Sequence, residues 1–561
     1  MPHAVSAADP TRLTTGAGSR EPGAGSREPG FVRVPVGEEA AHWVTVPAQR
    51  TLLAVARTVT STARVLDAVQ LLRDDPRVQV VFSFNDTSPF NDGVLPLLER
   101  AGARLVPWNR LGELTFDAAL TCSENTEFRA FDAPALVLQH GAGFHKILPD
   151  SRGEGRRLAG TVRAADLRGR RVTVAVTHPA QIAQLAAAEP AAADRAVLIT
   201  DPMLERLRAA RLLRHRYRTA LGLGDRRLVV LSSTWGRTSL LGRAPDLPAR
   251  LLAQLDAGTH AVASVLHPNI TAGHGALQLR LWLAAARDAG LLAVPPEAGW
   301  QAMLATADCV VGDHSSVSLL AAATGIPLLL APLSDEVVPG TPMTALSEAA
   351  VRLDLHRPLA AQVAAAIDGH TPDRYAAAVT ATFAEPPVTR PLRSVLYDLL
   401  ALPEPDGPAP LVAFPPPVPE TTPVHSYEMR TRVTADRIEI ERFPAAVRRH
   451  VRPPAEGWTG HLLSAADQEW DLRLLQNAEV LTQATGDPDV LVRFPGAALA
   501  CTAVPEGIIA ELRDGRRAIV SGQDVTALAA CAYALARAGA LTDGTWRAGD
   551  DAISVRLLPG L

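Results

Sequence analysis

From about residue 48 the chain alternates short, continuous apolar runs with segments of helical periodicity. Apolar runs at Thr51–Val59, Val78–Phe84 and Ala135–Gln139 predict strands, and helical patterns at Ala63–Arg73 and Gly93–Gly102 lie between them. Apolar strands separated by helices are typical of a parallel sheet covered on both faces. The same rhythm predicts further strands at Arg104–Pro107, Asp117–Thr121, Val172–Val176 and Ala196–Thr200, then a helix through Arg218. The pattern therefore predicts a doubly wound, Rossmann-like α/β half.

The architecture begins again at Leu228, although the sequence itself does not repeat. The strands expected in this second half are Leu228–Ser232, Ala261–Leu266, Leu291–Val294, Cys309–Val311 and Leu328–Ala331. We therefore expect two Rossmann-like halves, residues 48–222 and 223–402, that face each other across a cleft. This is the build of a transferase that uses a nucleotide-activated donor.

Three segments lie outside these halves. Residues 1–47 are expected to be a disordered arm and lead-in, because residues 1–30 carry a tandem GAGSREP repeat and no long apolar stretch of the kind that a signal peptide has. Residues 403–423 are too rich in proline for a helix or sheet and predict a stiff linker. Residues 424–561 predict a separate α+β domain with no evident chemistry. The elements expected there are a strand at Arg432–Glu441, a helix at Ala465–Gln483, a hairpin at Ile508–Val520 and a helix at Asp524–Arg537.

Composition narrows the functional classes. A net charge of −4 and a pI near 6.4 lack the basic character of nucleic-acid-binding proteins, so no nucleic-acid partner is expected. The four cysteines are far apart and form no CxxC pair, which argues against a zinc ribbon or a disulfide framework. No run of about 18 apolar residues occurs, so we expect a cytoplasmic protein without a spanning helix.

Lys146 is the only lysine in a chain that uses arginine freely. An ammonium group is a compact point charge, whereas a guanidinium group is a planar fork, and the two are not interchangeable. A requirement for an ammonium group at this position would explain the exception, and a chance survivor is the alternative.

The first candidate motif runs from Gln139 to Lys146, directly after an expected strand. His140 and Gly141 stand at the carboxyl end of that strand, where open α/β sheets place their ligands. A histidine there can act as general base on an acceptor hydroxyl. A turn histidine that only caps backbone groups is the alternative.

Two further motifs end strands of the second half. The segment Ser232–Arg237 contains Thr234 and Trp235 in a hydroxyl- and glycine-containing turn of the kind that can cradle phosphate, although ordinary turns share this composition. His267 precedes Pro268 at the end of the next strand, where its ring can donate to a phosphate oxygen. A simple His-Pro turn would look the same.

The fourth motif is the most specific. His314, Ser315 and Ser316 follow a strand and open a helix that stops at Gly325 before the next strand. The free N–H groups and positive dipole end of a helix attract anions, so a diphosphate is the expected guest. Two serines that merely cap the helix are the alternative.

In order and spacing, these four motifs resemble the CDP-glycerol glycerophosphotransferase family, which includes the teichoic-acid polymerases. The family's HGTPLKK segment resembles His140–Lys146, its PTWR turn resembles residues 233–236, and its SDYSSV segment resembles residues 312–317. His267 matches the family's strand-end histidine. The motifs cover about 140–335, and the architecture covers about 48–400.

The resemblance implies a GT-B fold and the transfer of a polyol phosphate from a CDP-linked donor, as in cell-wall polymer or glycan synthesis. His140 would be the base, and His267, Ser315 and Ser316 would hold the diphosphate. Gly141, Lys146, Thr234, Trp235 and His314 would complete the substrate site. No cofactor is implied beyond the CDP- or UDP-linked donor, and the acceptor would be a polyol phosphate or glycan.

Several positions depart from the family pattern. Ala142 stands where the family has threonine, His314 where it has tyrosine, and Leu319-Leu320 where it has Phe-Asp. A nucleotide-sugar-dependent GT-B glycosyltransferase and a non-catalytic nucleotide-binding scaffold are therefore alternative hypotheses. No metal is expected, because Asp487-Pro-Asp489 lies in an expected turn, and peripheral contact with the inner membrane face would suit a membrane-bound acceptor.

Overall fold

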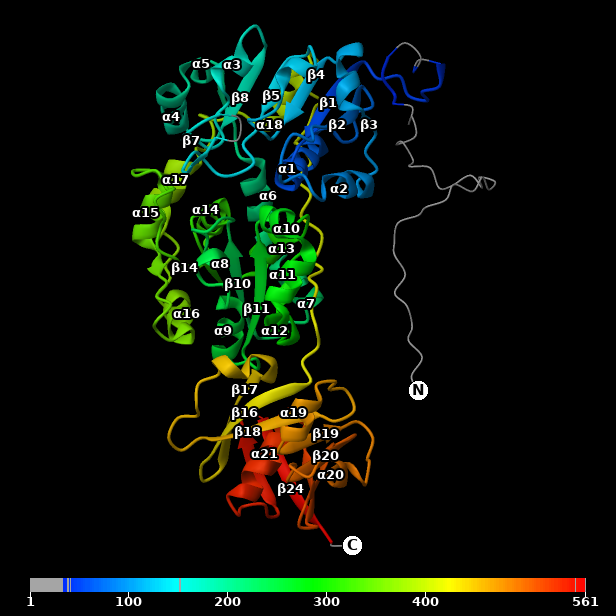
Figure 1. The fold of residues 1–561 in the computed structure, drawn as a ribbon, viewed down its shortest axis with the longest axis vertical. Coiled ribbons are helices and arrows are strands. Elements are labelled where there is room, and N and C mark those ends of the chain that lie inside the picture. The colour runs from blue at the N-terminus through cyan, green and yellow to red at the C-terminus, as the bar shows by residue number, and fades with distance from the viewer. Residues whose placement is uncertain (1–33, 38–39, 41, 151–152, 550, 560–561) are drawn as a thin grey trace, which may run out of the picture.

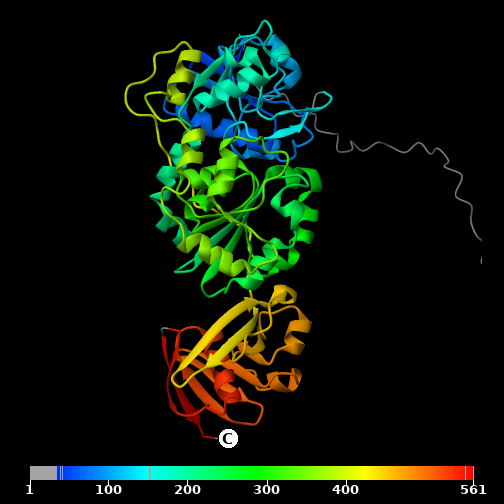
Figure 2. The same cartoon turned by 90° about the vertical axis from the view of Figure 1, so that its left-hand side faces the viewer.

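A computed structural model describes residues 34–37, 40, 42–150, 153–549 and 551–559. The disordered arm expected at 1–30 lies outside these residues. Three bodies follow one another along the long axis of the molecule: two helix-covered sheets and a barrel at the C-terminal end (Figure 1). The view turned by 90° shows the same three bodies in line (Figure 2).

The first sheet has seven parallel strands in the order β3-β2-β1-β4-β5-β8-β9, which is a doubly wound topology. Its strands are β1 Arg50–Ala56, β2 Val78–Phe84, β3 Leu105–Val106, β4 Ala118–Thr121, β5 Ala135–Val137, β8 Val172–Val176 and β9 Ala196–Leu198. The helices of this half are α1 Val59–Val69, α2 Val94–Arg100, α3 Ala164–Leu167, α4 Pro179–Ala188 and α5 Pro190–Ala193, with short 3₁₀ turns at Gln70–Leu72, Trp108–Glu113 and Phe128–Ala130. A small hairpin, β6 Ile147–Pro149 and β7 Arg156–Leu158, projects from this half. Each strand of the seven-stranded sheet lies within a few residues of its expected position, whereas the hairpin β6–β7 was not predicted.

Helix α1 begins one turn earlier than the apolar pattern predicted, at Val59 and not at Ala63. Thr58 accepts a hydrogen bond from the backbone N–H of Ser61, and the Ser61 hydroxyl bonds back to the Thr58 backbone. This reciprocal cap satisfies two free N–H groups and so fixes the helix start.

The second sheet has six parallel strands in the order β12-β11-β10-β13-β14-β15. They are β10 Arg227–Ser233, β11 His260–Leu266, β12 Leu292–Ala293, β13 Cys309–Gly312, β14 Leu328–Leu330 and β15 Val351–Arg352. Its helices are α8 Leu240–Arg243, α9 Leu247–Gln254, α10 Pro268–His274, α11 Ala276–Trp282, α12 Ala284–Asp288, α13 Trp300–Thr306, α14 Ser316–Ala323, α15 Pro342–Ala349, α16 Leu359–Asp368 and α17 Ala376–Thr382. The two parallel α/β sheets confirm the expected mixed α/β architecture.

The chain crosses between the halves at points that differ from the expected boundaries of 222 and 402. Helices α6 (Pro202–Arg211) and α7 (Arg214–Ala220) pack into the second core, with Leu207 and Tyr217 fully buried there. Helix α18 (Leu392–Leu399) returns to the first core, where Leu396 is fully buried. The helix that ends near Arg218 was predicted from the sequence, but helix α18 was not, and neither was the core that each helix covers.

The proline-rich segment 403–423 forms no helix and runs along the side of the second half (Figure 1). Phe414 is buried in the second core, and its carbonyl accepts a hydrogen bond from the Tyr217 hydroxyl. Glu420 pairs with Ala293 in an isolated antiparallel bridge. These contacts hold the segment against the second half. A proline-rich chain loses little conformational entropy when it is held in an extended form.

The C-terminal region forms a closed nine-stranded barrel, which corrects the expectation of a plain α+β domain. Its strands are β16 Ser426–Val433, β17 Arg437–Pro444, β18 Thr459–Ala465, β19 Val480–Gln483, β20 Leu499–Val504, β21 Gly507–Leu512, β22 Arg517–Ser521, β23 Gly544–Ala548 and β24 Asp551–Leu558, and its helical segments are a 3₁₀ stretch Ala445–His450, α19 Leu472–Asn477, α20 Val490–Arg493 and α21 Val525–Arg537. The hairpin at 508–520 and the helix at 524–537 are confirmed. The single strand expected at 432–441 spans the end of β16, a turn at 434–436 and the first part of β17, and the helix expected at 465–483 is instead the end of β18, helix α19 and strand β19.

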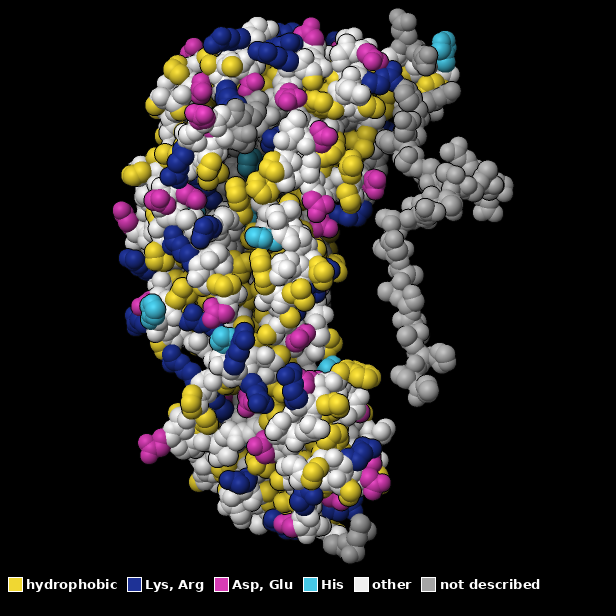
Figure 3. Space-filling view, viewed as in Figure 1, with side chains coloured by type: hydrophobic (Ala, Val, Ile, Leu, Met, Phe, Trp, Pro, Cys, Tyr) yellow, Lys and Arg dark blue, Asp and Glu magenta, His cyan; other side chains and the backbone are white. Residues whose placement is uncertain are grey.

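Helix α21 fills the barrel. Residues 528–535 are buried on every side of the helix, which contacts strands around the barrel. Four of these eight positions are alanine, and small side chains let a helix approach the surrounding strands closely. Among the described residues, no helix is long and apolar enough to cross a membrane. On the face drawn in Figure 3, acidic and basic side chains are interspersed.

Candidate functional site

A cavity of about 210 Å³ lies between the two sheets, at the carboxyl ends of their strands. The first half contributes helix α1 and the loops after β4 and β5, and the second half contributes the turns after β10, β11, β12 and β13. Of the nine residues predicted for the site, eight line this cavity: His140, Gly141, Lys146, Thr234, Trp235, His267, Ser315 and Ser316. Segments up to about 175 residues apart in sequence thus meet at one place.

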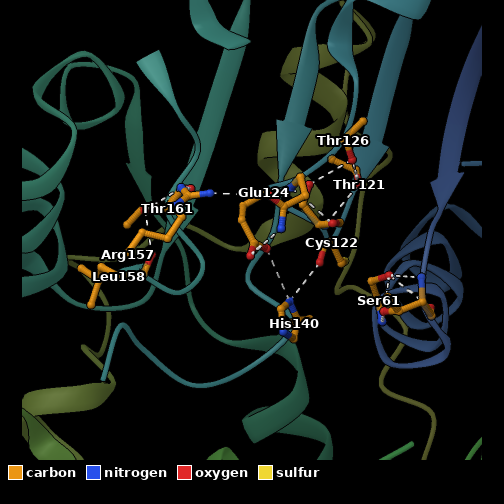
Figure 4. Close-up of polar contacts among 12 residues, drawn as sticks. Ser61, Thr121, Cys122, Glu124, Thr126, His140, Arg157, Leu158 and Thr161 are labelled. Carbon is orange, nitrogen blue, oxygen red and sulfur yellow. Dashed lines mark hydrogen bonds and ion pairs between the residues drawn. The ribbon is translucent and has the colours of Figure 1, made fainter. Parts of the chain in front are cut away.

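His140 projects into the cavity from the first half, with 40% of its side chain exposed. Its Nδ1 lies 3.2 Å from the Cys122 carbonyl oxygen, which follows strand β4 (Figure 4). A carbonyl can only accept a hydrogen bond, so Nδ1 carries the proton and Nε2 keeps its lone pair. The contact therefore selects the tautomer in which Nε2 has the free lone pair.

Gly141 lies where the halves touch. A Cβ atom added at Gly141 would lie 2.5 Å from the Ser316 Oγ, so only glycine fits this approach. The backbone N–H of Ala142 donates to the same Ser316 Oγ at 2.9 Å. Ser316 therefore joins the two halves with its hydroxyl, in addition to standing at the start of α14.

His145 and Lys146 fasten the same loop to the second half. The His145 ring is buried, with Nδ1 3.1 Å from the Ala142 carbonyl and Nε2 3.1 Å from the His314 carbonyl. Burial, followed by the nearby Lys146 ammonium, lowers the pKa of His145 to about 4. The backbone of Lys146 forms an antiparallel bridge with Val337. These contacts hold the loop at 145–147 as part of both halves.

The chain's only lysine donates from its Nζ to the Thr234 Oγ1 at 2.9 Å. Burial lowers the pKa of Lys146, while the charges of Asp313 and Glu336 partly offset that effect. An ammonium group donates from a single point to a hydroxyl across the interface, which a planar guanidinium would do with poorer geometry. The contact supplies a physical reason for a lysine at this position.

Asp313 organises the turn that Thr234 begins, and reasoning from the sequence missed it. Its carboxylate accepts hydrogen bonds from the backbone N–H groups of Thr234 and Leu240, each at 2.9 Å. Asp313 is only 1% exposed, and burial raises its pKa against the opposing effect of these bonds and of Lys146. Its place beside the serine motif was visible in the sequence, but its turn-holding contacts depend on the neighbouring strand.

Trp235 and His267 form the next part of the second-half surface. The centroid of the Trp235 ring lies 5.0 Å from the ring centroid of Phe90 in the first half and 6.4 Å from that of His267. The Nδ1 of His267 accepts from the Asn269 backbone N–H at 3.1 Å, so the neutral ring carries its proton on Nε2. Burial, Lys146 and His140 lower the pKa of His267 to about 3. His267 is therefore a neutral hydrogen-bond donor near pH 7.

Ser315 is the N-cap residue of α14, yet its hydroxyl caps nothing. Its side chain is 7% exposed, and among the described residues its Oγ has no hydrogen-bond partner. Buried hydroxyl groups are almost always satisfied, so this unpaired hydroxyl at the cavity wall is free to donate to a bound molecule. The start of α14 adds its positive dipole end at the same place.

His314 is the predicted site residue that does not line the cavity. Its buried ring lies 3.4 Å from the Ser334 hydroxyl and 3.5 Å from the Glu336 carboxylate. Burial, Lys146, His145 and Arg243 lower its pKa to about 3. The ring thus packs within the second half, against the loop after β14, while the His314 backbone carbonyl contacts His145 of the first half.

Among the described residues, no group of three or more His, Cys, Asp or Glu side chains could hold a metal ion. Asp487 lies in the barrel, where it pairs with Arg493, and Asp489 precedes the short helix α20. The groups that line the cavity and could interact with an anion are Lys146, the histidines, the start of α14 and Arg64, which pairs with Asp201.

The fold and the cavity define a two-sheet α/β protein with an interdomain site. No protein-family model matches the chain, and no curated protein matches it. Among solved structures, the wall teichoic acid polymerase TagF is 12% identical, with 64% of this chain and 89% of that chain covered and a TM-score of 0.40. A glycosyltransferase from Rickettsia africae is 11% identical over 63% and 98%, with a TM-score of 0.37. UDP-GlcNAc 2-epimerase from Neisseria meningitidis, bound to UDP-GlcNAc, is 12% identical over 63% and 99%, with a TM-score of 0.36.

Proposed function

We propose that this chain is a transferase that moves a polyol phosphate, of the glycerophosphate kind, from a CDP-linked donor to an acceptor hydroxyl. The observation that carries the proposal is the pairing across one cavity of a basic imidazole nitrogen on His140 with an unpaired buried hydroxyl on Ser315. A base on one side and anion-binding groups on the other are what such a transfer needs.

The acceptor would enter beside the first half. Its hydroxyl would give a proton to the Nε2 of His140, and its oxygen would form a bond to the polyol-phosphate phosphorus. The bond between that phosphorus and the bridging oxygen would break, and CMP would leave with the electron pair. The two substrates, held in one cavity, would react as if in a unimolecular step.

The donor diphosphate would lie against the second half. Ser315 and the start of α14 would donate to its oxygens, and the Nε2–H of His267 would stabilise the charge that grows on CMP. Because the pKa of His267 is held near 3, the ring stays a neutral donor throughout the working pH range. No protonation of His267 is required for this role.

The identity of the released nucleotide tests this proposal. Purified protein would be incubated with CDP-glycerol, CDP-ribitol and several UDP- and GDP-sugars, together with polyol-phosphate and glycan acceptors. Polyol-phosphate transfer releases CMP, whereas glycosyl transfer breaks the sugar–oxygen bond and releases a nucleoside diphosphate. Release of CMP that is lost in His140→Ala is the expected result, with His215→Ala, an exposed histidine on α7, as the matched control.

Two outcomes would contradict the proposal. Release of a nucleoside diphosphate from a sugar donor would make the chain a glycosyltransferase that uses the same base. Tight nucleotide binding without release from any donor would make it a binding scaffold.

A further inference from the structure

Glu124 is a cavity-lining carboxylate to which no role has yet been given. It stands in the turn after β4, its side chain is 13% exposed, and its Oε2 lies 4.0 Å from the Nδ1 of His140 (Figure 4). We propose that Glu124 is a positioning residue for His140, and that its charge stabilises the imidazolium that forms when His140 takes a proton. This inference rests on the proposed function.

The turn that carries Glu124 is rigid. The Thr121 and Thr126 hydroxyls lie 2.8 Å apart and are buried, and the Ser123 backbone N–H donates to Thr121. The Asn125 side-chain amide donates to the Glu124 Oε1 at 3.2 Å. One carboxylate oxygen is thus held in place, and the other faces the imidazole.

Two acceptors near the Nδ1 of His140 act in different ways. The Cys122 carbonyl lies 3.2 Å from Nδ1 and fixes the tautomer without any charge. The Glu124 carboxylate is farther away, and its contribution grows only when the ring becomes positive. Removal of the charge alone should therefore leave the neutral ring in place and weaken the base.

Glu124 also differs from the other carboxylates of the cavity. Asp67 pairs with Arg206, Asp201 pairs with Arg64, and Glu297 pairs with Arg100. Glu124 instead faces a histidine.

Other titratable groups line the same cavity. Lys146 lines it from the loop after β5, and His267, whose ring is neutral near pH 7, lines it from the turn after β11. Glu124 supplies a negative charge beside the His140 ring.

The isosteric substitution Glu124→Gln separates charge from shape, and Glu127→Gln, an exposed glutamate three residues later, is the matched control. Diethylpyrocarbonate modifies only unprotonated imidazole, so its rate at His140, followed by peptide mass spectrometry from about pH 5 to about pH 8, reports the basicity of the ring directly. In Glu124→Gln the midpoint should move to a pH lower by about 0.5 to 1, and in Glu127→Gln it should not move. Identical midpoints in all three proteins would overturn the inference.

Kinetics supply the second measurement, on the full chain with the donor that it turns over. Glu124→Gln should lower kcat about tenfold, leave KM unchanged and move the acidic limb of the kcat profile to lower pH. Glu124→Asp, which keeps the charge, should retain more activity than Glu124→Gln. An unchanged kcat in Glu124→Gln would refute the positioning role. If the wild-type chain turns over no donor, the proposed function fails, and the reagent titration still decides whether Glu124 acts on His140.

Discussion

The cavity between the two sheets and the interior of the barrel are both bounded by strands, but they are filled differently. In the barrel, helix α21 occupies the interior, and its buried residues 528–535 pack against the surrounding strands. In the cleft, the strands stop short, and their carboxyl ends leave polar turns around an open volume. Strand ends have free backbone groups, and these groups can form a ligand-binding site. A closed sheet whose interior is filled by a helix acts instead as a structural unit.

The largest effect is expected from removal of the proposed catalytic base in the cleft. His140→Ala should lower kcat by at least about 10²-fold, because it removes the base, and should change the free energy of unfolding by less than about 0.5 kcal/mol, because the side chain is half-exposed. Product formation and denaturant unfolding check the two parts. Wild-type kcat in this variant would place the catalytic base elsewhere.

Lys146→Met tests whether the cleft depends on its buried charge. The substitution removes the donor to Thr234 and leaves the buried Asp313 carboxylate without its nearest cation, so the free energy of unfolding should fall by about 3 kcal/mol. Arg216→Met, at an exposed position on α7, is the control and should have little effect. Equal stability of the two variants in urea would show that the ammonium group does not hold the halves together.

A double-mutant cycle tests the close approach of Gly141 to Ser316 between the halves. Gly141→Ala should destabilise the chain by about 1–2 kcal/mol, because the added Cβ would lie 2.5 Å from the Ser316 Oγ. In a Ser316→Ala background the same change should cost little, because the next atom, the Cβ of residue 316, lies 3.5 Å away. Strict additivity of the two substitutions in thermal unfolding would contradict the close approach.

The smallest effect concerns the barrel. His461 is 3% exposed, and its ring centroid lies 4.5 Å from that of Tyr533. Within the described part of the chain, neither nitrogen of the His461 ring has a hydrogen-bond partner. Burial lowers the pKa of His461 to about 4, so the unfolded chain binds the proton first as pH falls below about 6.5. Barrel stability should therefore be fully present above about pH 6.5 and decline towards pH 4.

His461→Leu should flatten that decline and gain about 1 kcal/mol at pH 5 relative to the wild type. Thermal unfolding at pH 5 and pH 7 measures the change, and the cleft variants serve as comparison because they all keep His461. A wild-type pH dependence in His461→Leu would assign the decline to other groups.

Much of the fold was readable from the sequence, because apolar runs bury strands wherever a sheet is covered on both faces. Strands β2 and β8 begin and end at the predicted residues, Val78–Phe84 and Val172–Val176. The barrel was read less well, since the apolar spacing across 465–483 suits a helix as well as two short parallel strands with a helix between them. Closure of the sheet decided between them, and closure depends on partners far away in sequence.

The positions of the polar turns follow from the sequence, because glycine, proline and small hydroxyl residues end strands by local chemistry. Eight of the nine residues predicted from these turns line one cavity. Only the tertiary structure decided which way each side chain faces. It turned His314 towards Glu336, set Asp313 beneath the Thr234 turn and brought Glu124 to His140. These pairings join separate strands, and strand order is a property of the packed sheet and not of any local stretch of sequence.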